Sequence, residues 1–254
     1  MSQEKKASTA CAIIIGNEIL SGRTQDANLP FIGQRCDELG IRLTESRIIP
    51  DDEATIIAAV NECRRNFTYV FTTGGIGPTH DDITALSVAH AFDRGLERNQ
   101  EAIAALDRYY PPEKLTEARL KMADIPVGAT LIDNPVSGAP GFQLENVFVF
   151  AGVPSIMREM FNGITDRLAG GEPVLTGNVT TDLTEGVLAE GLGRLQEKYA
   201  DVSIGSYPFF RQGKLGVNIV SRGTNKQHLQ ALIQELKELI NTLDGNVILV
   251  EGDD

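Results

Sequence analysis

The chain has 254 residues, of which 42% are hydrophobic and 23% charged, a composition typical of a folded protein and not of a disordered one. Its 23 Lys and Arg residues are outnumbered by 35 Asp and Glu residues, which gives a formal net charge of -12. Because non-specific binding to nucleic acid or to an acidic membrane needs a cationic surplus, this balance disfavours both partners. It does not argue against small anions, since backbone amides and metals can bind those.

The N-terminal residues MSQEKKASTA are polar, and no apolar run approaches the roughly 20 residues that span a bilayer. We therefore expect a cytoplasmic protein with no membrane contact. Cys11, Cys36 and Cys63 have neither pairing nor metal-ligand spacing, and the three histidines do not cluster. These cysteines are expected to be small buried residues in a reducing compartment, and a structural zinc site is not expected.

The N-terminal part of the chain alternates predicted strands with predicted helices. Strands are expected over 10–15, 43–49 and 69–72, where short apolar runs end at turn residues. Between them, apolar residues recur at spacings of three and four over 29–39 and 56–67, which predicts two helices. This alternation predicts an α/β fold with a three-layer, mostly parallel sheet covered on both faces.

Shorter elements are expected from residue 83 to residue 168. A helix should carry Ile83, Leu86 and His90 on one apolar stripe, and two more helices should occupy 97–122 on either side of Pro111-Pro112. A short strand is expected over 129–132, a β-hairpin over 142–144 and 147–150, and an amphipathic helix from Pro154 onward.

The segment AGGEP, residues 169–173, interrupts the pattern and predicts a boundary between domains 1–170 and 171–254. The elements expected beyond it are a strand (174–182), a helix (184–199), two strands (202–208 and 214–221), a helix (225–241) and a strand (246–250). This βαββαβ order predicts a small α+β domain.

The segment TTGGIGPTHDD, residues 72–82, is the strongest candidate for a binding site. Its three glycines allow the chain to turn its amides toward a ligand between a strand and a helix, a place that favours a phosphate. Asp81 and Asp82 would repel a phosphate unless a hard divalent cation such as Mg²⁺ lay between them. In the simpler alternative, one of these aspartates caps the helix that starts near Ile83.

Five segments occur in order, and together they resemble the molybdopterin-binding (MoaB/Mog-like) superfamily: GNEILSGRTQDAN, PDD, TTGGIGPTHDD, NPVSGAPGF and AGVP. The variant resembles the N-terminal part of competence/damage-inducible CinA-type proteins. The match covers about residues 8–168, and the remainder resembles the small domain that follows in that group. Because the chain ends there, the nicotinamide-nucleotide deamidase activity of longer members is not expected.

The resemblance implies a pocket at the carboxyl ends of the strands for a nucleotide or pterin phosphate, with molybdopterin as one candidate ligand. It places Asp81 and Asp82 at a divalent metal and, with Asp51 and Glu18, in the catalytic set. The residues expected to bind the substrate or its phosphate are Ser21, Gly22, Asp26, Asn28, Thr73, Gly74, Gly75, Gly77, Pro78, Thr79, Ser137, Gly138, Ala139, Pro140 and Gly141.

Two residues depart from the family pattern. Asn17 stands where Asp or Thr is more usual, and His80 lies at a variable position, so no catalytic role is assigned to it. Asp51-Asp52 also has a structural alternative, in which Asp52 caps the helix that follows and Asp51 is left as the site candidate.

Three functions are compatible with these residues. The first is metal-dependent hydrolysis of a nucleotide pyrophosphate such as ADP-ribose or FAD, in which the metal activates water and backbone amides stabilise the phosphoryl oxygens. The second is adenylyl transfer to molybdopterin, and the third is a binding module without turnover. The resemblance also implies a homo-oligomer.

Overall fold

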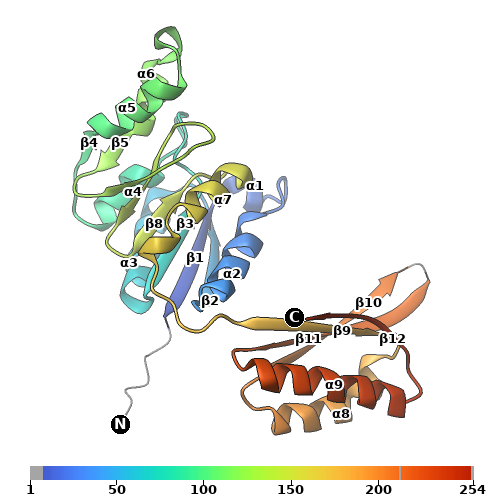
Figure 1. Cartoon of the computed structure of the whole chain (residues 1–254). Coiled ribbons are helices and arrows are strands. Elements are labelled where there is room, and N and C mark those ends of the chain that lie inside the picture. The colour runs from blue at the N-terminus through green and yellow to red at the C-terminus, as the bar shows by residue number, and fades with distance from the viewer. Residues whose placement is uncertain (1–7, 212, 253–254) are drawn as a thin grey trace, which may run out of the picture. The chain divides into compact units, whose positions relative to one another are not determined.

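The computed structural model describes residues 8–211 and 213–252 (Figure 1). The chain divides into two compact units, Met1–Gly171 and Glu172–Asp254. Each unit has its own hydrophobic core, so each is described by itself.

The first unit is built on a six-stranded sheet with the order β2-β1-β3-β8-β7-β6. Its parallel part consists of β1 (Thr9–Ile15), β2 (Arg42–Ile49), β3 (Tyr69–Thr73) and β8 (Val147–Phe150). The strands β7 (Gly141–Leu144) and β6 (Thr130–Ile132) extend it in antiparallel fashion, and β7 and β8 form the predicted hairpin. The expected mostly parallel sheet is confirmed.

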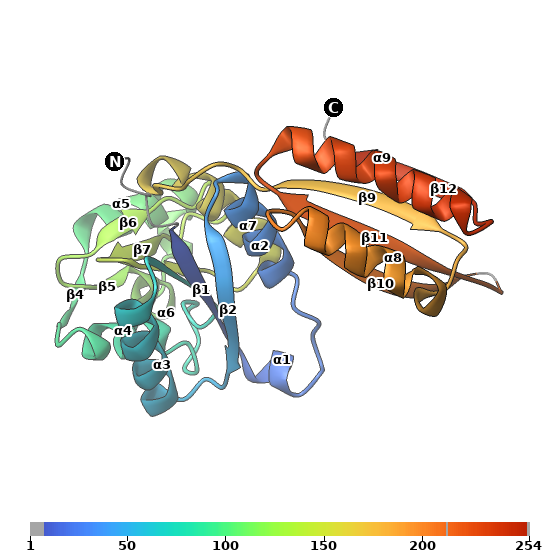
Figure 2. The ribbon, with the colours of Figure 1, turned by 90° about the horizontal axis from the view of Figure 1, so that it is seen from below.

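Helices cover both faces of this sheet, because successive side chains of a strand point to opposite faces. On β1, Cys11, Ile13 and Ile15 enter one core, whereas Ala10 and Ala12 enter the other. The first core is closed by α3 (Glu53–Asn66), α4 (Thr84–Ala91) and α5 (Gln100–Tyr109), and the second by α2 (Asn28–Glu38) and α7 (Pro154–Asn162). Figure 2 shows α3 and α4 on one side of β1 and α2 on the other. The three-layer prediction is thus confirmed.

The stripe predicted for α4 is wrong. Leu86 and His90 are exposed, and His90 Nδ1 lies 2.5 Å from a carboxylate oxygen of Glu53. The buried face of α4 instead carries the small residues Ser87, Val88 and Ala91, which are compatible with close packing against α3.

Several short elements were not predicted. They are α1 (Asn17–Leu20), the two-stranded sheet of β4 (Leu96–Arg98) and β5 (Asp124–Pro126), and the 3₁₀ turns η1 (Pro112–Lys114), η2 (Lys121–Ala123) and η3 (Thr165–Arg167). The second helix expected before residue 122 is the single turn α6 (Glu117–Leu120). Elements this short carry too few residues to show a periodicity.

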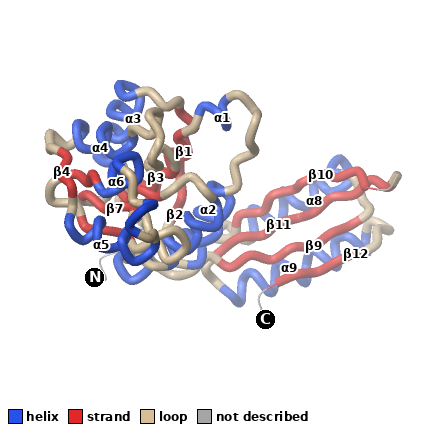
Figure 3. Tube along the Cα trace, turned by 90° about the horizontal axis from the view of Figure 1, so that it is seen from above, coloured by secondary structure: helices blue, strands red, loops and turns tan. Residues whose placement is uncertain are grey.

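The second unit has the predicted βαββαβ order. Its strands are β9 (Leu175–Thr181), β10 (Ser203–Arg211), β11 (Lys214–Gly223) and β12 (Val247–Gly252), which form an antiparallel sheet with the order β10-β11-β9-β12. Figure 3 shows α8 (Glu185–Lys198) and α9 (Lys226–Thr242) on the same face of these strands. Among the described residues, none of the helices combines the length and apolar composition needed to cross a bilayer.

Candidate functional site

A cleft of about 670 Å³ lies at the carboxyl end of the parallel strands in the first unit. Its walls come from the segments that follow β1, β3 and β8, together with the loop 134–139. Because parallel strands all end at the same edge of a sheet, residues far apart in the sequence meet there, as the α/β architecture predicts.

The glycine loop, residues 74–82, begins with two residues that only glycine can supply. Gly74 has a φ of +104°, and a Cβ there would lie 2.1 Å from the carbonyl oxygen of Ile15. Gly75 has a φ of +68°, and a Cβ there would lie 2.2 Å from Oγ1 of Thr84. These positions let the chain turn sharply from β3 into the cleft.

The turn leaves backbone donors available in the cleft wall. Ile76 and Gly77 line the cleft, and their N–H groups donate to no acceptor among the described residues. Adjacent free amides in a loop with left-handed backbone form a concave arrangement that binds anions. The loop therefore carries two unpaired backbone donors at the cleft wall, within the segment where the sequence predicts a phosphate site.

Asp82 holds the glycine loop closed rather than capping a helix. One oxygen of its carboxylate, Oδ2, accepts hydrogen bonds from the backbone N–H of Thr79 at 2.8 Å and from its hydroxyl at 2.5 Å. The N-cap of α4 is Ile83, without a side-chain hydrogen bond. The capping alternative is therefore wrong for both Asp81 and Asp82.

Asp81 is exposed and lines the cleft. The nearby Thr79 hydroxyl and the residue's own backbone N–H hold the pKa of the Asp81 carboxyl below its usual value. This side chain is therefore an anion at neutral pH, available to a cation in the cleft.

Lys121 fixes the glycine loop from outside the cleft. Its Nζ donates to the carbonyl oxygens of Thr79 at 2.5 Å and of Asp82 at 2.9 Å. The sequence predicts no role for Lys121, because this residue lies 39 positions from its nearer partner and belongs to no motif. The ammonium group of Lys121 therefore stabilises the position of the glycine loop.

The opposite side of the cleft carries Glu18 and Asp51. Glu18 is exposed, and its side-chain oxygens make no hydrogen bond within the part of the chain that the structure describes. Asp51 accepts a hydrogen bond from the backbone N–H of Asn17 at 2.9 Å, which ties α1 to the end of β2. The helix cap is its neighbour Asp52, which accepts from the Thr55 N–H at 2.9 Å.

In the rest of the first loop, residues 16–28, Thr24 lines the cleft, whereas Asp26 and Asn28 support it without lining it. Asp26 accepts from the N–H groups of Asn28 and Leu29, at 3.2 and 2.9 Å, and so starts α2. The buried Asn28 donates from Nδ2 to the Thr73 hydroxyl at 3.2 Å and to the Gly152 carbonyl oxygen at 2.8 Å. It thereby joins the ends of β3 and β8.

Asn134 organises the remaining wall. Its Oδ1 accepts from the N–H groups of Val136 and Ser137, both at 3.1 Å, while its Nδ2 donates to the Ser137 hydroxyl and the Ala139 carbonyl, both at 2.7 Å. Asn134 is 3% exposed and was not predicted as a site residue. Its place at the start of a turn-rich loop is the signal that could have identified it.

Arg119 and Tyr110 were also missed. The guanidinium of Arg119 lies 4.6 Å from the centre of the Tyr110 ring, and both residues line the cleft. Tyr110 directly precedes Pro111-Pro112 and Arg119 lies two positions before Lys121, in a stretch without a recognisable motif. Against four lining carboxylates, Arg119 is the single charged cationic side chain among the described lining residues.

The structure thus divides the predicted site residues into two groups. Those that line the cleft are Glu18, Asp51, Gly74, Gly75, Gly77, Pro78, Asp81, Asp82, Ser137 and Ala139. Those that do not are Ser21, Gly22, Asp26, Asn28, Thr73, Thr79, Gly138, Pro140 and Gly141. Pro140 lines a smaller adjoining cavity of about 260 Å³ instead.

Comparison with known proteins identifies the family to which the chain belongs. The family model described as a probable molybdopterin binding domain matches residues 11–170, more than half of the chain. The chain belongs to this family. A protein of Archaeoglobus fulgidus is 33% identical over 229 residues, which cover 90% of this chain and 96% of that protein.

Within the molybdopterin-binding family, the chain is of the CinA type. A crystal structure of the protein CinA from Thermoplasma acidophilum is similar with a TM-score of 0.59 and 33% identity, over 63% of this chain and 98% of that one. Both the resemblance to CinA-type proteins and the predicted fold are therefore confirmed.

A second family model matches the second unit. A family model described as the middle domain of FAD synthase matches residues 173–244. A probable FAD synthase of Caenorhabditis elegans is 31% identical over 258 residues, which cover 91% of this chain and 50% of that protein. The chain thus spans about half the length of that relative.

Proposed function

We propose that the cleft binds the phosphates of a nucleotide pyrophosphate of the FAD or ADP-ribose type and hydrolyses it with the help of a divalent cation. The observation that carries this proposal is the pair of free amides at Ile76 and Gly77, set beside the carboxylates of Asp81 and Asp82. Amides favour the phosphate, and the carboxylates favour it only through a shared cation.

The donor set fits a cation that is shared with the substrate. Asp81 is exposed, and Asp82 keeps Oδ1 available because Thr79 occupies only Oδ2. Magnesium is usually bound by one or two carboxylates together with substrate phosphates and water. Among the described residues, the cleft carboxylates form no group of three converging ligand atoms, so a cage made of protein alone does not fit. A cation at Asp81 and Asp82 would neutralise phosphate charge and lower the pKa of a bound water.

The chain's own groups supply positioning and charge stabilisation. The Ile76 and Gly77 amides would donate hydrogen bonds to phosphoryl oxygens. Because Lys121 and Asp82 already hold the loop in place, these amides would stabilise the charge of the transition state without a rearrangement. Arg119 also lines the cleft, and its guanidinium would bind a second phosphate of the substrate. Water adds to one phosphorus, the bridging P–O bond breaks, and FAD would yield FMN and AMP.

A general base would take the proton from the attacking water. Glu18 and Asp51 are the candidates, and Glu18 is the better one because its carboxylate is free of hydrogen bonds within the described chain, whereas Asp51 already accepts from Asn17.

The comparisons favour FAD as the first substrate to test, because both a relative and the family of the second unit are named for FAD synthase. The match to a probable molybdopterin binding domain favours a second candidate function, adenylyl transfer to molybdopterin in the same cleft. In either reaction a nucleotide phosphate would occupy the glycine loop.

The test is AMP release from FAD and from ADP-ribose by the full chain with Mg²⁺, Mn²⁺ or Co²⁺. We expect release by the parent protein, loss of at least 100-fold in Asp81→Ala and Asp82→Asn, and no change in Asp166→Ala, a control at an exposed aspartate outside the cleft. Circular dichroism would check the fold of each variant.

Absence of release with every cation would overturn hydrolysis of these substrates. Product formation that requires both ATP and molybdopterin would establish adenylyl transfer instead. Tight nucleotide binding without turnover, unaffected by added metal, would establish a binding module. A parallel incubation with FMN and ATP would show whether the reaction runs toward FAD.

A further inference from the structure

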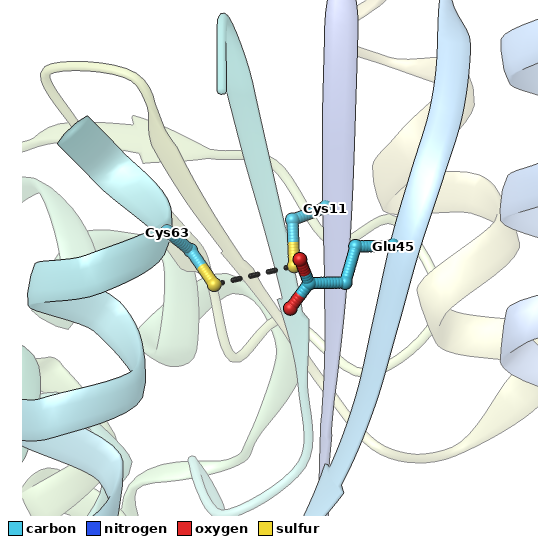
Figure 4. A group of neighbouring side chains, drawn as sticks. All are labelled: Cys11, Glu45 and Cys63. Atoms are coloured by element: carbon cyan, nitrogen blue, oxygen red, sulfur yellow. Dashed lines mark hydrogen bonds between the residues drawn. The ribbon is translucent and has the colours of Figure 1, made fainter. Parts of the chain in front are cut away.

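Two cysteines that are far apart in the sequence meet inside the first core. Cys11 lies on β1 and Cys63 near the end of α3, and their sulfur atoms are 3.3 Å apart although the residues are 52 positions apart in the chain. Both side chains are completely buried. Glu45 on β2 is the third member of the group, and Figure 4 shows the three side chains pointing toward one another.

We propose that Cys11, Cys63 and Glu45 form a binding site for a thiophilic divalent cation, foremost Zn²⁺, with water as the fourth ligand. One ligand atom from each residue lies within 4.8 Å of the other two. Of the described residues, no other group of three histidine, cysteine or acidic side chains converges in this way. Three protein ligands from two residue types, together with one open position, are a known zinc arrangement.

The ligand spacing needs little adjustment to hold a metal. With Zn–S bonds of about 2.3 Å in a tetrahedral arrangement, two thiolate sulfurs lie about 3.8 Å apart. The sulfur atoms of Cys11 and Cys63 are 3.3 Å apart, so a movement of about half an ångström between them suffices. Side-chain rotation can supply a shift of this size without moving β1 or α3.

The charge of the surroundings suits the exchange of protons for a metal ion. Zn²⁺ would replace one proton on each of the two thiols, so the net charge of the group stays the same and two protons are released to solvent. Oε1 of Glu45 accepts from Arg47 Nε at 2.6 Å, which leaves Oε2 available, and Arg47 is also bound to Glu62 at 2.7 Å. These contacts would orient the carboxylate as an outer partner of a metal ligand commonly does.

A metal can reach the group from the Glu45 side, because the Glu45 side chain is 39% exposed whereas both thiols are buried. The group is separate from the cleft. Cys11 precedes Ile15, the cleft residue on the same strand, by four positions, or about 13 Å at the rise of a β-strand. Sulfur ligation therefore distinguishes this site from the oxygen ligands proposed for the cleft.

The experiment titrates the full chain, purified under reducing conditions, with CoCl₂ and then ZnCl₂. Thiolate bound to Co²⁺ gives a near-ultraviolet charge-transfer band, which oxygen ligands in the cleft do not produce. We expect one equivalent of Co²⁺ to develop this band, Zn²⁺ to abolish it, and about two protons to be released per Zn²⁺ in weakly buffered solution.

Matched variants identify the ligands. Cys63→Ser should abolish the band, and Glu45→Gln should weaken Zn²⁺ affinity by at least tenfold while leaving the buried thiols in place. Cys36→Ser is the control, because this cysteine is buried in the other core and burial raises the pKa of its thiol to about 12. Zn²⁺ should also raise the melting temperature of the parent and of Cys36→Ser, but not of Cys63→Ser.

Three results would overturn the proposal. One is the absence of the charge-transfer band in the reduced parent protein. Another is a band of full strength in a folded Cys63→Ser, or, should that variant not fold, unchanged Zn²⁺ affinity in Glu45→Gln. The third is a band that is lost equally in Cys36→Ser, which would assign the thiolate ligand to a different cysteine.

Discussion

The glycine loop and the first loop, residues 16–28, stand on either side of the same cleft but contribute to it differently. In the glycine loop, most of the motif residues themselves line the cleft, including both aspartates and the free amides of Ile76 and Gly77. In the first loop, Glu18 and Thr24 line it, whereas Ser21 and Gly22 are exposed elsewhere and Asp26 serves to start α2.

This difference shows that a family motif combines two kinds of residue. Some offer atoms to a ligand, and others hold the backbone that carries those atoms. Asn28 belongs to the second kind, because its amide joins the Thr73 hydroxyl and the Gly152 carbonyl while its side chain stays buried. Substitutions should therefore separate effects on stability from effects on binding, and three of them test the contrast.

The largest effect is expected for Gly74→Ala. The new methyl group would lie 2.1 Å from the Ile15 carbonyl oxygen, in a backbone conformation with φ at +104°. Backbone strain and overlap with a main-chain atom act together, so we expect a destabilisation of about 3–5 kcal/mol and loss of nucleotide binding. Urea unfolding and equilibrium dialysis would measure the two effects.

The control for Gly74→Ala is Gly95→Ala, since a Cβ at Gly95 meets no atom within 4 Å and its φ is not in the left-handed region. It should change stability by less than about 0.5 kcal/mol. If Gly74→Ala were as stable as this control and still bound nucleotide, the glycine loop would not require the sharp turn described above.

An intermediate effect is expected for Asn28→Ala. The substitution leaves the Gly152 carbonyl without its donor, removes the bond to Thr73 and opens a small space beneath the cleft. Loss of one buried and one partly buried hydrogen bond should cost about 1–3 kcal/mol. Because Asn28 does not line the cleft, affinity should fall less than in Asp81→Ala, which should leave stability nearly unchanged. Equal losses of affinity in both variants would contradict the division into lining and supporting residues.

Most of the fold could be predicted because the sequence carries strong local periodicities. The β1 run of buried residues, the apolar stripe of α2 and the hairpin of β7 and β8 all depend on neighbours in the chain. The α4 stripe failed because small residues such as Ser87 and Ala91 can be buried against α3, so polarity did not identify the packed face.

The candidate site could be predicted only in part. The glycine loop is contiguous, so its turn, amides and carboxylates are visible together in the sequence. Lys121 acts on the glycine loop across 39 residues and Arg119 lies in a motif-poor segment, so their roles depend on the tertiary fold. Asn134 is a local case, because its partners lie within five residues of it in the turn-rich loop. The contact between Cys11 and Cys63 was not predicted either, because no rule of residue spacing joins positions 52 apart in the chain.

The smallest effect is expected for Gly22→Ala, which isolates backbone strain from steric overlap. Gly22 has a φ of +68°, as a left-handed turn requires, but a Cβ there would meet no atom within 4 Å. The alanine should therefore lower the free energy of unfolding by about 1 kcal/mol, as a left-handed non-glycine residue usually does. Nucleotide affinity should stay within about twofold of the parent. Both are measurable by urea unfolding and equilibrium dialysis of the full chain. A loss of affinity at unchanged stability would place Gly22 in direct contact with the ligand, and the first loop would then act like the glycine loop.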